Sequence, residues 1–212
     1  MTQHIYSRRP TGNSAIPDTI FIILIINALV FGLQQFAPQF TFKFLALQPL
    51  VSPPGYITPS FIPWQLVTYG FVHSTSSLMH IIFNMLMLWM FGRDIEGIMG
   101  ARRFFIYYIT CVVGAGVIQL LVGVLQGGGA PTVGASGGVF GILLAYGMAF
   151  PNRRIMLMFP PIPMKAKYFV IMLGLFELSL GFSGVNNGVA NFAHLGGMLF
   201  GFWLIKYWGK RR

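Results

Sequence analysis

The chain has 212 residues, of which 55% are hydrophobic and only 8% are charged. Soluble domains carry about 25% charged residues, so the composition excludes an ordinary soluble enzyme and indicates an integral membrane protein. The formal net charge is +10, but the basic residues stand in short clusters between apolar segments. That pattern is typical of membrane topology and argues against a nucleic-acid partner.

The apolar segments predict the number of membrane spans. A spanning helix needs about 20 mostly apolar residues, and we expect six such helices, several of them short, at about 19–36, 78–91, 104–125, 134–150, 168–182 and 192–208. The predicted fold is an all-α membrane protein, a six-transmembrane-helix bundle. We expect one domain over 1–212, with a short cytoplasmic tail at 1–17.

The segment 37–77 does not fit a spanning helix. It is apolar, but six prolines interrupt it, and prolines this dense prevent a continuous helix. We interpret it as a long membrane-interfacial loop between the first and second helices, a depth that suits Trp64 and Tyr69. The alternative is a seventh span.

The basic residues predict the orientation of these spans. With six spans, every lysine and arginine of the chain's 14 except Lys43 falls on one side of the membrane. The positive-inside rule then places both termini of this multi-pass protein in the cytoplasm. We expect a bacterial cell membrane, because the chain shows no transit peptide or large extra domain.

Four polar side chains are predicted to lie at one depth in the membrane. His80, Asn84, Ser136 and His194 all fall in the first turns of three spans that begin at the outer face, within roughly 10 Å of depth. Each residue alone is also explained by helix packing or an interfacial position. Polar groups in hydrocarbon are costly without partners, and a serine beside a histidine is a nucleophile beside its base.

Neighbouring residues support a shared site. Phe140 follows Ser136 by four residues and lies on the same helix face. Gly197 and Gly201 follow His194 by three and seven residues. Their missing side chains are expected to let the last span approach the 134–150 span.

Four short motifs carry a family resemblance. The segments are PWQLVT at 63–68, HIIFN at 80–84, GASG at 134–137 and AHLGG at 193–197. In this order they resemble the rhomboid intramembrane serine proteases, over nearly the whole of 63–201.

The resemblance implies roles for individual residues. Ser136 would be the nucleophile and His194 the general base. The side chains of His80 and Asn84, with the backbone amide of Ser136, would form the oxyanion site. Phe140 occupies a position where the family often has an aromatic ring stacked on the histidine, and Gly134 belongs to the serine motif.

The sequence does not decide whether a third residue acts with Ser136 and His194. Glu177 lies inside the 168–182 span, about 9 Å from its outer end by helical rise, so a Ser-His-Glu triad is conceivable. The family resemblance implies a dyad instead, which we prefer. Asn186, Asn187 and Asn191 make the loop before the last span polar enough to admit water.

The resemblance also implies a lateral gate for substrates. Phe83 on the second span and Phe176 on the fifth are expected to touch at similar depth. The alternative is that they are ordinary lipid-facing or core aromatics.

These observations predict an intramembrane serine protease that hydrolyses peptide bonds in or near transmembrane segments. Its expected partners are transmembrane protein substrates and the lipid bilayer, with no nucleic acid, cofactor or metal. A catalytically inactive rhomboid-like adaptor that binds helices is the alternative, although such relatives typically lack the serine or the histidine. A channel would need polar residues through the full membrane depth.

Overall fold

The computed structural model describes residues 19–156, 162–183 and 190–210, which are mostly helical. The helices, in chain order, are α1 (Thr19–Phe36), α2 (Pro38–Phe44), α3 (Gln65–Thr68), the 3-10 turn η2 (Tyr69–Phe71), α4 (Leu78–Met99), α5 (Ala101–Leu125), α6 (Ser136–Ala149), α7 (Ala166–Phe182) and α8 (Asn191–Lys210). Two short strands, β1 (Arg154–Met156) and β2 (Pro163–Lys165), pair antiparallel between α6 and α7.

Each of the six predicted segments forms a helix in this structure. α1 has the predicted bounds, whereas α4 continues to Met99, past the predicted end near 91. It stops at Gly100, whose φ of +77° is a conformation that glycine adopts readily. Three of the described helices, α1, α4 and α5, are long and apolar enough to cross a membrane.

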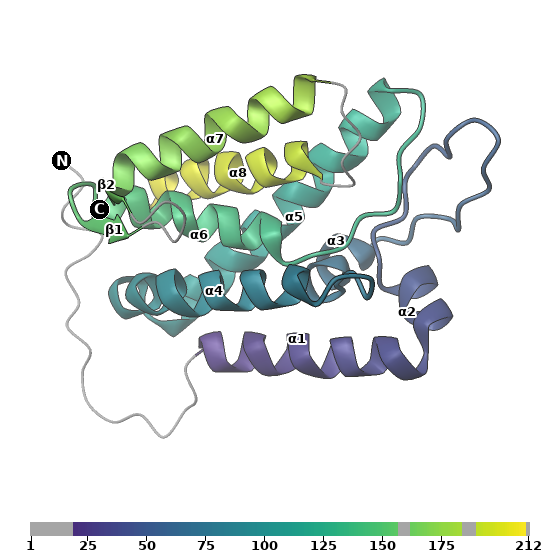
Figure 1. Ribbon diagram of the computed structural model, residues 1–212, viewed down its shortest axis with the longest axis horizontal. Coiled ribbons are helices and arrows are strands. Elements are labelled where there is room, and N and C mark those ends of the chain that lie inside the picture. Colours follow the sequence, from purple (N-terminus) through teal and green to yellow (C-terminus); the bar gives the residue numbers. More distant parts are fainter. Residues whose placement is uncertain (1–18, 157–161, 184–189, 211–212) are drawn as a thin grey trace.

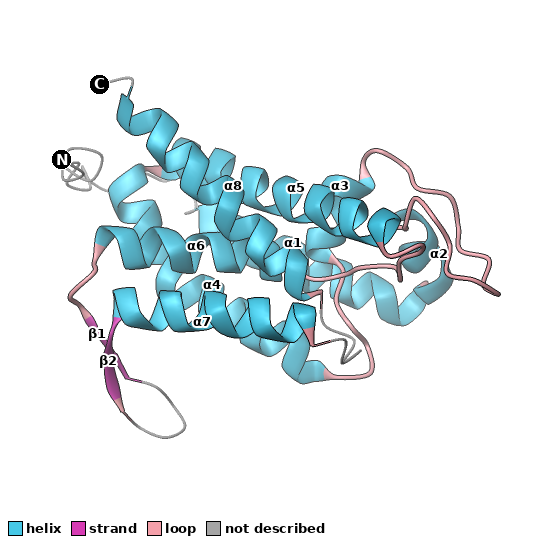
Figure 2. Ribbon diagram, turned by 90° about the horizontal axis from the view of Figure 1, so that it is seen from above, coloured by secondary structure: helices cyan, strands magenta, loops and turns pink. Residues whose placement is uncertain are grey.

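The helices that carry the candidate residues lie side by side in the bundle. α5 packs against both α6 and α8, and α6 also contacts α4 and α7. α4, α6 and α8 begin at the same end of the molecule, the right-hand end in Figure 1, where α2 and α3 also lie. Figure 2 shows the same arrangement from above, with β1 and β2 at the opposite end. The starts of three helices therefore meet at one end of the bundle.

Polar side chains tie both ends of α1 to the rest of the bundle. The Glu96 carboxylate accepts hydrogen bonds from the backbone amides of Thr19 (2.7 Å) and Ile20 (3.2 Å). These amides belong to the first turn of α1 and have no partner within the helix. The negative charge of Glu96 also suits the positive end of the helix dipole at the start of α1. At the other end of α1, Gln34 and the backbone of His73 exchange two hydrogen bonds, of 2.6 and 2.9 Å.

The segment 37–77 is partly helical, since it contains α2, α3 and η2. Side chains of the PWQLVT motif hold it together. Gln65 accepts hydrogen bonds from the amides of Gln48 and Ile62 and donates to the carbonyl of Lys43. Tyr69 donates to the carbonyl of Val112 on α5 at 2.7 Å. This segment is therefore fastened to the bundle by specific hydrogen bonds as well as by its apolar residues.

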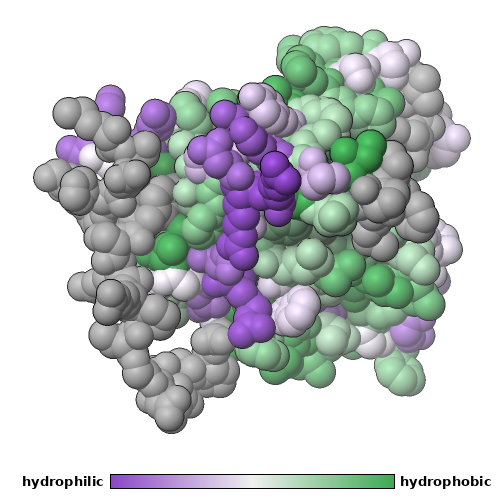
Figure 3. Space-filling model, turned by 60° about the vertical axis from the view of Figure 1, so that its left-hand side comes forward, coloured by the Kyte–Doolittle hydropathy of each residue, from purple (hydrophilic) through white to green (hydrophobic). Residues whose placement is uncertain are grey.

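The opposite end of the bundle carries the basic clusters. Arg153 and Asp94 form an exposed ion pair of 2.6 Å that links the residue before β1 to α4. Figure 3 brings this end forward and shows a hydrophilic band between more hydrophobic surfaces. Neither strand was expected from the sequence.

Candidate active site

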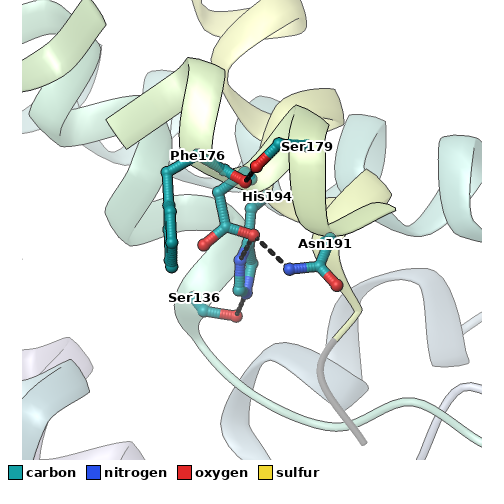
Figure 4. A network of polar contacts seen from close by, with 6 residues as sticks. Ser136, Phe176, Ser179, Asn191 and His194 are labelled. Atoms are coloured by element: carbon teal, nitrogen blue, oxygen red, sulfur yellow. Dashed lines mark hydrogen bonds and ion pairs between the residues drawn. The ribbon is translucent and has the colours of Figure 1, made fainter. Parts of the chain in front are cut away.

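Ser136 and His194 meet at the starts of α6 and α8. Ser136 is the first residue of α6 and His194 is the fourth residue of α8. The His194 Nε2 atom lies 2.8 Å from Ser136 Oγ, and Figure 4 shows the two side chains pointing toward each other. The structure thus joins two residues that are 58 positions apart in the chain.

Glycines allow α6 and α8 to approach this closely. A β-carbon on Gly197 would collide with the backbone carbonyl of Gly137, and one on Gly141 would lie 3.2 Å from the carbonyl of Gly197. Gly201 does not serve this contact, contrary to expectation. A β-carbon there would meet Tyr107 and Cys111 of α5, because α8 packs against α5 as well as α6 and turns its next glycine toward α5.

The Phe140 ring covers one face of the His194 imidazole. The ring centroids lie 4.2 Å apart and the planes differ by 12°. Phe140 is one helical turn beyond Ser136, so α6 supplies both the hydroxyl and the stacked ring. This contact fixes the plane in which the imidazole lies.

A carboxylate approaches the other nitrogen of the same imidazole. Glu177 Oε2 lies 3.0 Å from His194 Nδ1, and it accepts a hydrogen bond of 2.7 Å from Asn191 Nδ2. Nδ1 makes no hydrogen bond of good angular geometry, and the contact becomes an ion pair when the imidazole is protonated. Asn191 was expected in a polar loop, but it is buried at the start of α8. Asn186 and Asn187 lie outside the described residues.

His80 and Asn84 stand on α4 beside the serine motif. Ser74 donates its backbone amide to His80 Nδ1 at 3.1 Å. In a neutral imidazole the proton then resides on Nε2, which becomes a donor. A β-carbon on Gly134, whose φ is +128°, would lie 3.0 Å from that Nε2 atom and 3.5 Å from Ser136 Oγ. The donor from α4 and the Ser136 hydroxyl thus both border Gly134.

Asn84 is buried one turn further along α4. Its side-chain nitrogen donates to the carbonyl of His80 at 2.7 Å, which leaves the second hydrogen of the amide for another acceptor. The free amides in the first turn of α6 begin at Ser136. These groups are hydrogen-bond donors on two helices that share one end of the bundle.

The structure does not bring Phe83 and Phe176 into ring contact. Their side chains are 49% and 56% exposed, and no stacking between them occurs among the described residues. α4 and α7 each pack against α6. Over the same described residues, no three His, Cys, Asp or Glu side chains form a metal-binding group.

Together, the fold and the site define a helical membrane protein with a serine–histidine pair at the ends of two packed helices. The family model described as the Rhomboid domain matches residues 61–211. This match covers more than half of the chain, and it includes all four motifs on which the resemblance rests. The chain belongs to the rhomboid family, which contains the rhomboid proteases.

Several curated proteins are similar to this chain. It is 29% identical, over 92% of its length, to Rhomboid protein 1, mitochondrial, of Saccharomyces cerevisiae, of which it covers 56%. It is 31% identical, over 62% of its length, to the Presenilin-associated rhomboid-like protein, mitochondrial, of Rattus norvegicus, of which it covers 35%. The Rhomboid protease GluP of Bacillus subtilis is 29% identical over 66% of the chain, which covers 25% of that protein. The chain thus spans between a quarter and just over half of these relatives.

The comparisons contradict the predicted location in a cell membrane with both termini in the cytoplasm. The yeast and rat relatives are both mitochondrial proteins by name. The prediction rests on the absence of a targeting segment, but the chain spans only part of each relative, so that absence carries no weight. Clusters of basic residues distinguish the two sides of a membrane and do not identify which membrane it is.

Proposed function

We propose that this protein is an intramembrane serine protease that cuts peptide bonds in or near transmembrane segments of other proteins. The observation that carries the proposal is the 2.8 Å contact between Ser136 Oγ and His194 Nε2. A hydroxyl becomes a useful nucleophile when a base lies within hydrogen-bond reach to accept its proton. Membership of the rhomboid family supports the same reaction.

In the proposed reaction, Ser136 Oγ attacks the substrate carbonyl while its proton passes to His194 Nε2. The negative charge that develops on the carbonyl oxygen is stabilised by donors from His80, Asn84 and the Ser136 amide. His194 then gives the proton to the leaving amine, and water hydrolyses the acyl-enzyme. This mechanism needs no cofactor or metal.

The length of α6 supports chemistry below the membrane surface. α6 has 14 residues and is therefore about 21 Å long, shorter than the roughly 30 Å hydrocarbon layer. We infer a six-span domain in which the segment 37–77 lies at the membrane interface and the start of α6 is sunk into the bilayer. A substrate bond would then meet Ser136 within or near its own transmembrane segment.

We also infer that a transmembrane substrate reaches Ser136 laterally, between α4 and α7. Phe83 and Phe176 are both half-exposed on these helices. Since their rings do not stack in the described residues, the proposed route needs no aromatic contact to break. The two side chains would instead line the path of the substrate helix.

An inactive rhomboid-like adaptor would bind transmembrane helices without cutting them. The same glycine contacts and half-exposed helices would serve that function. The paired hydroxyl and imidazole favour the protease, because an adaptor gains nothing from a proton acceptor held 2.8 Å from a serine.

Cleavage of a fluorogenic transmembrane substrate by purified protein in lipid vesicles tests the proposal. Ser136→Ala and His194→Ala should each abolish cleavage while the Tm in detergent stays near that of the parent. Ser179→Ala is the matched control, because the Ser179 hydroxyl donates to the Phe176 carbonyl. Undiminished cleavage by a folded Ser136→Ala protein would contradict the mechanism.

A further inference from the structure

Glu177 is a buried carboxylate in the middle of an apolar helix. The residue is 6% exposed, and its Oε2 atom lies 3.0 Å from His194 Nδ1 and 2.7 Å from Asn191 Nδ2. One oxygen atom of Glu177 therefore accounts for both contacts. Glu177 thus contacts one nitrogen of the imidazole and Ser136 contacts the other, and Figure 4 shows Asn191 beside His194.

A carboxylate in such a place needs compensation. An unpaired buried charge is strongly destabilising, and α7 provides no basic residue between 168 and 182. The facing groups come from other helices. His194 and Asn191 on α8 contact Glu177 directly, and His80 on α4 interacts electrostatically with His194. Of these, His194 is the group that can take up a positive charge beside the carboxylate.

The geometry also selects one form of the imidazole. A hydrogen on Nδ1 would point toward the Glu177 carboxylate, and Nε2 would then offer its lone pair to the Ser136 hydroxyl. The Nδ1 contact is within hydrogen-bond reach although its angle is poor, and catalytic hydrogen bonds often align only when substrate binds. The opposite form would place a lone pair against a carboxylate oxygen.

We propose that Glu177, held by Asn191, is a positioning residue that completes a Ser-His-Glu triad in this protein. It keeps the hydrogen of His194 on Nδ1 and stabilises the imidazolium that forms when Nε2 accepts the Ser136 proton. The Nδ1 hydrogen stays on nitrogen throughout, and no proton passes to Glu177. The inference rests on the proposed protease function and adds a member to its site.

The decisive variant is Glu177→Gln, which removes the charge and keeps the shape of the side chain. The kcat for a transmembrane substrate should fall about 10²-fold with little change in KM. A merely structural role would lower the Tm and raise KM as well as lowering kcat.

Three further variants test the charge of Glu177, the hydrogen bond that holds it, and the effect of an unrelated substitution on the same helix. Glu177→Asp keeps the charge and should retain more activity than Glu177→Gln. Asn191→Ala removes the hydrogen bond that holds the carboxylate and should lower kcat several-fold, in line with one lost charge-assisted hydrogen bond. Ser179→Ala, two residues away on α7, should match the parent. Parent-like kcat in a folded Glu177→Gln protein would overturn the triad.

The parent side chains provide a test that needs no Glu177 variant to fold. In Ser136→Ala protein labelled with ¹⁵N-histidine, the His194 resonance, identified by its loss in His194→Ala, should show Nδ1 protonated and Nε2 free. The opposite form would overturn the proposal. Failure of the protease function is distinct, because the parent itself would then cleave no substrate.

Discussion

The Phe140 ring lies parallel to the His194 imidazole, with centroids 4.2 Å apart, one helical turn beyond Ser136. α6 thereby determines both where the hydroxyl stands and how the imidazole of α8 is oriented. The two nitrogen atoms lie at the edge of the imidazole, which the stacked ring leaves free for polar contacts. One edge atom, Nε2, meets Ser136, and the other, Nδ1, meets Glu177.

Loss of this stacking should weaken catalysis without abolishing it. An aromatic contact is worth about 0.5–1.5 kcal/mol beyond area burial, so Phe140→Leu should lower kcat roughly 2- to 10-fold. Phe140→Tyr keeps the ring and should stay close to the parent. Steady-state kinetics of all three proteins on one transmembrane substrate would measure the effect. An unchanged kcat in Phe140→Leu would show that other contacts hold the imidazole.

Removal of either proposed oxyanion donor on α4 should act mainly on turnover. His80→Ala and Asn84→Ala should each lower kcat by about 10²–10³, with smaller changes in KM, because a donor aimed at the developing charge acts in the transition state. The measurement is again kcat and KM in lipid vesicles. Normal turnover in both single variants would mean that other groups hold the oxygen.

The positions of the helices and of the Ser136–His194 pair followed from general physical constraints. Apolar length and the distribution of basic residues set the helix segments and their directions, and those directions put His80, Ser136 and His194 at one depth. The structure has all three at the same end of the bundle. Which residues lie at the same end of the bundle was therefore predictable from the sequence.

Rotation about each helix axis is much harder to predict. The position of Glu177 suggested a depth, but whether α7 turns it toward His194 depends on packing against α6 and α8. The same difficulty explains two wrong expectations. Gly201 faces α5 rather than α6, and the rings of Phe83 and Phe176 do not stack. Asn191 was misplaced because the start of α8 was predicted one residue too late, which left this residue in a loop.

The closest backbone contact between α6 and α8 should be intolerant of any side chain. In Gly197→Ala the new methyl group would collide with the Gly137 carbonyl, a rigid neighbour, and we expect a loss of at least about 1–3 kcal/mol in stability. Gly97→Ala on α4 is the matched control, because open space surrounds that position. It should be neutral or stabilising by up to about 1 kcal/mol. Thermal unfolding of both proteins in detergent measures the difference.

Stability should fall in acid because of a buried histidine in the segment 37–77. Desolvation, together with the nearby His80, lowers the pKa of His73 from 6.5 to about 4. In the unfolded chain the His73 side chain therefore binds a proton below pH 6.5, whereas in the folded protein it binds one only below about pH 4. The stability associated with neutral His73 is present above pH 6.5 and decreases as pH falls toward 4, by up to about 1.4 kcal/mol per unit.

The variant His73→Leu isolates this contribution. The hydrogen bonds between His73 and Gln34 use the backbone of His73, so they survive the substitution. We expect the Tm of the variant in detergent to depend less on pH between 6.5 and 4 than that of the parent. Equal slopes in the two proteins would contradict the lowered pKa.

The final prediction concerns lateral access of the substrate between α4 and α7. With Phe83→Cys and Phe176→Cys introduced together, a bifunctional maleimide should bridge the two helices, while the native Cys111 is buried and protected. The bridge should reduce cleavage of a transmembrane substrate at least about tenfold, because that substrate must pass between the helices. Hydrolysis of a small soluble ester, which reaches Ser136 from water, should change far less. Each single-cysteine variant treated with the same reagent is the control for modification alone. Equal inhibition of both substrates by the bridge, or of neither, would place the route elsewhere.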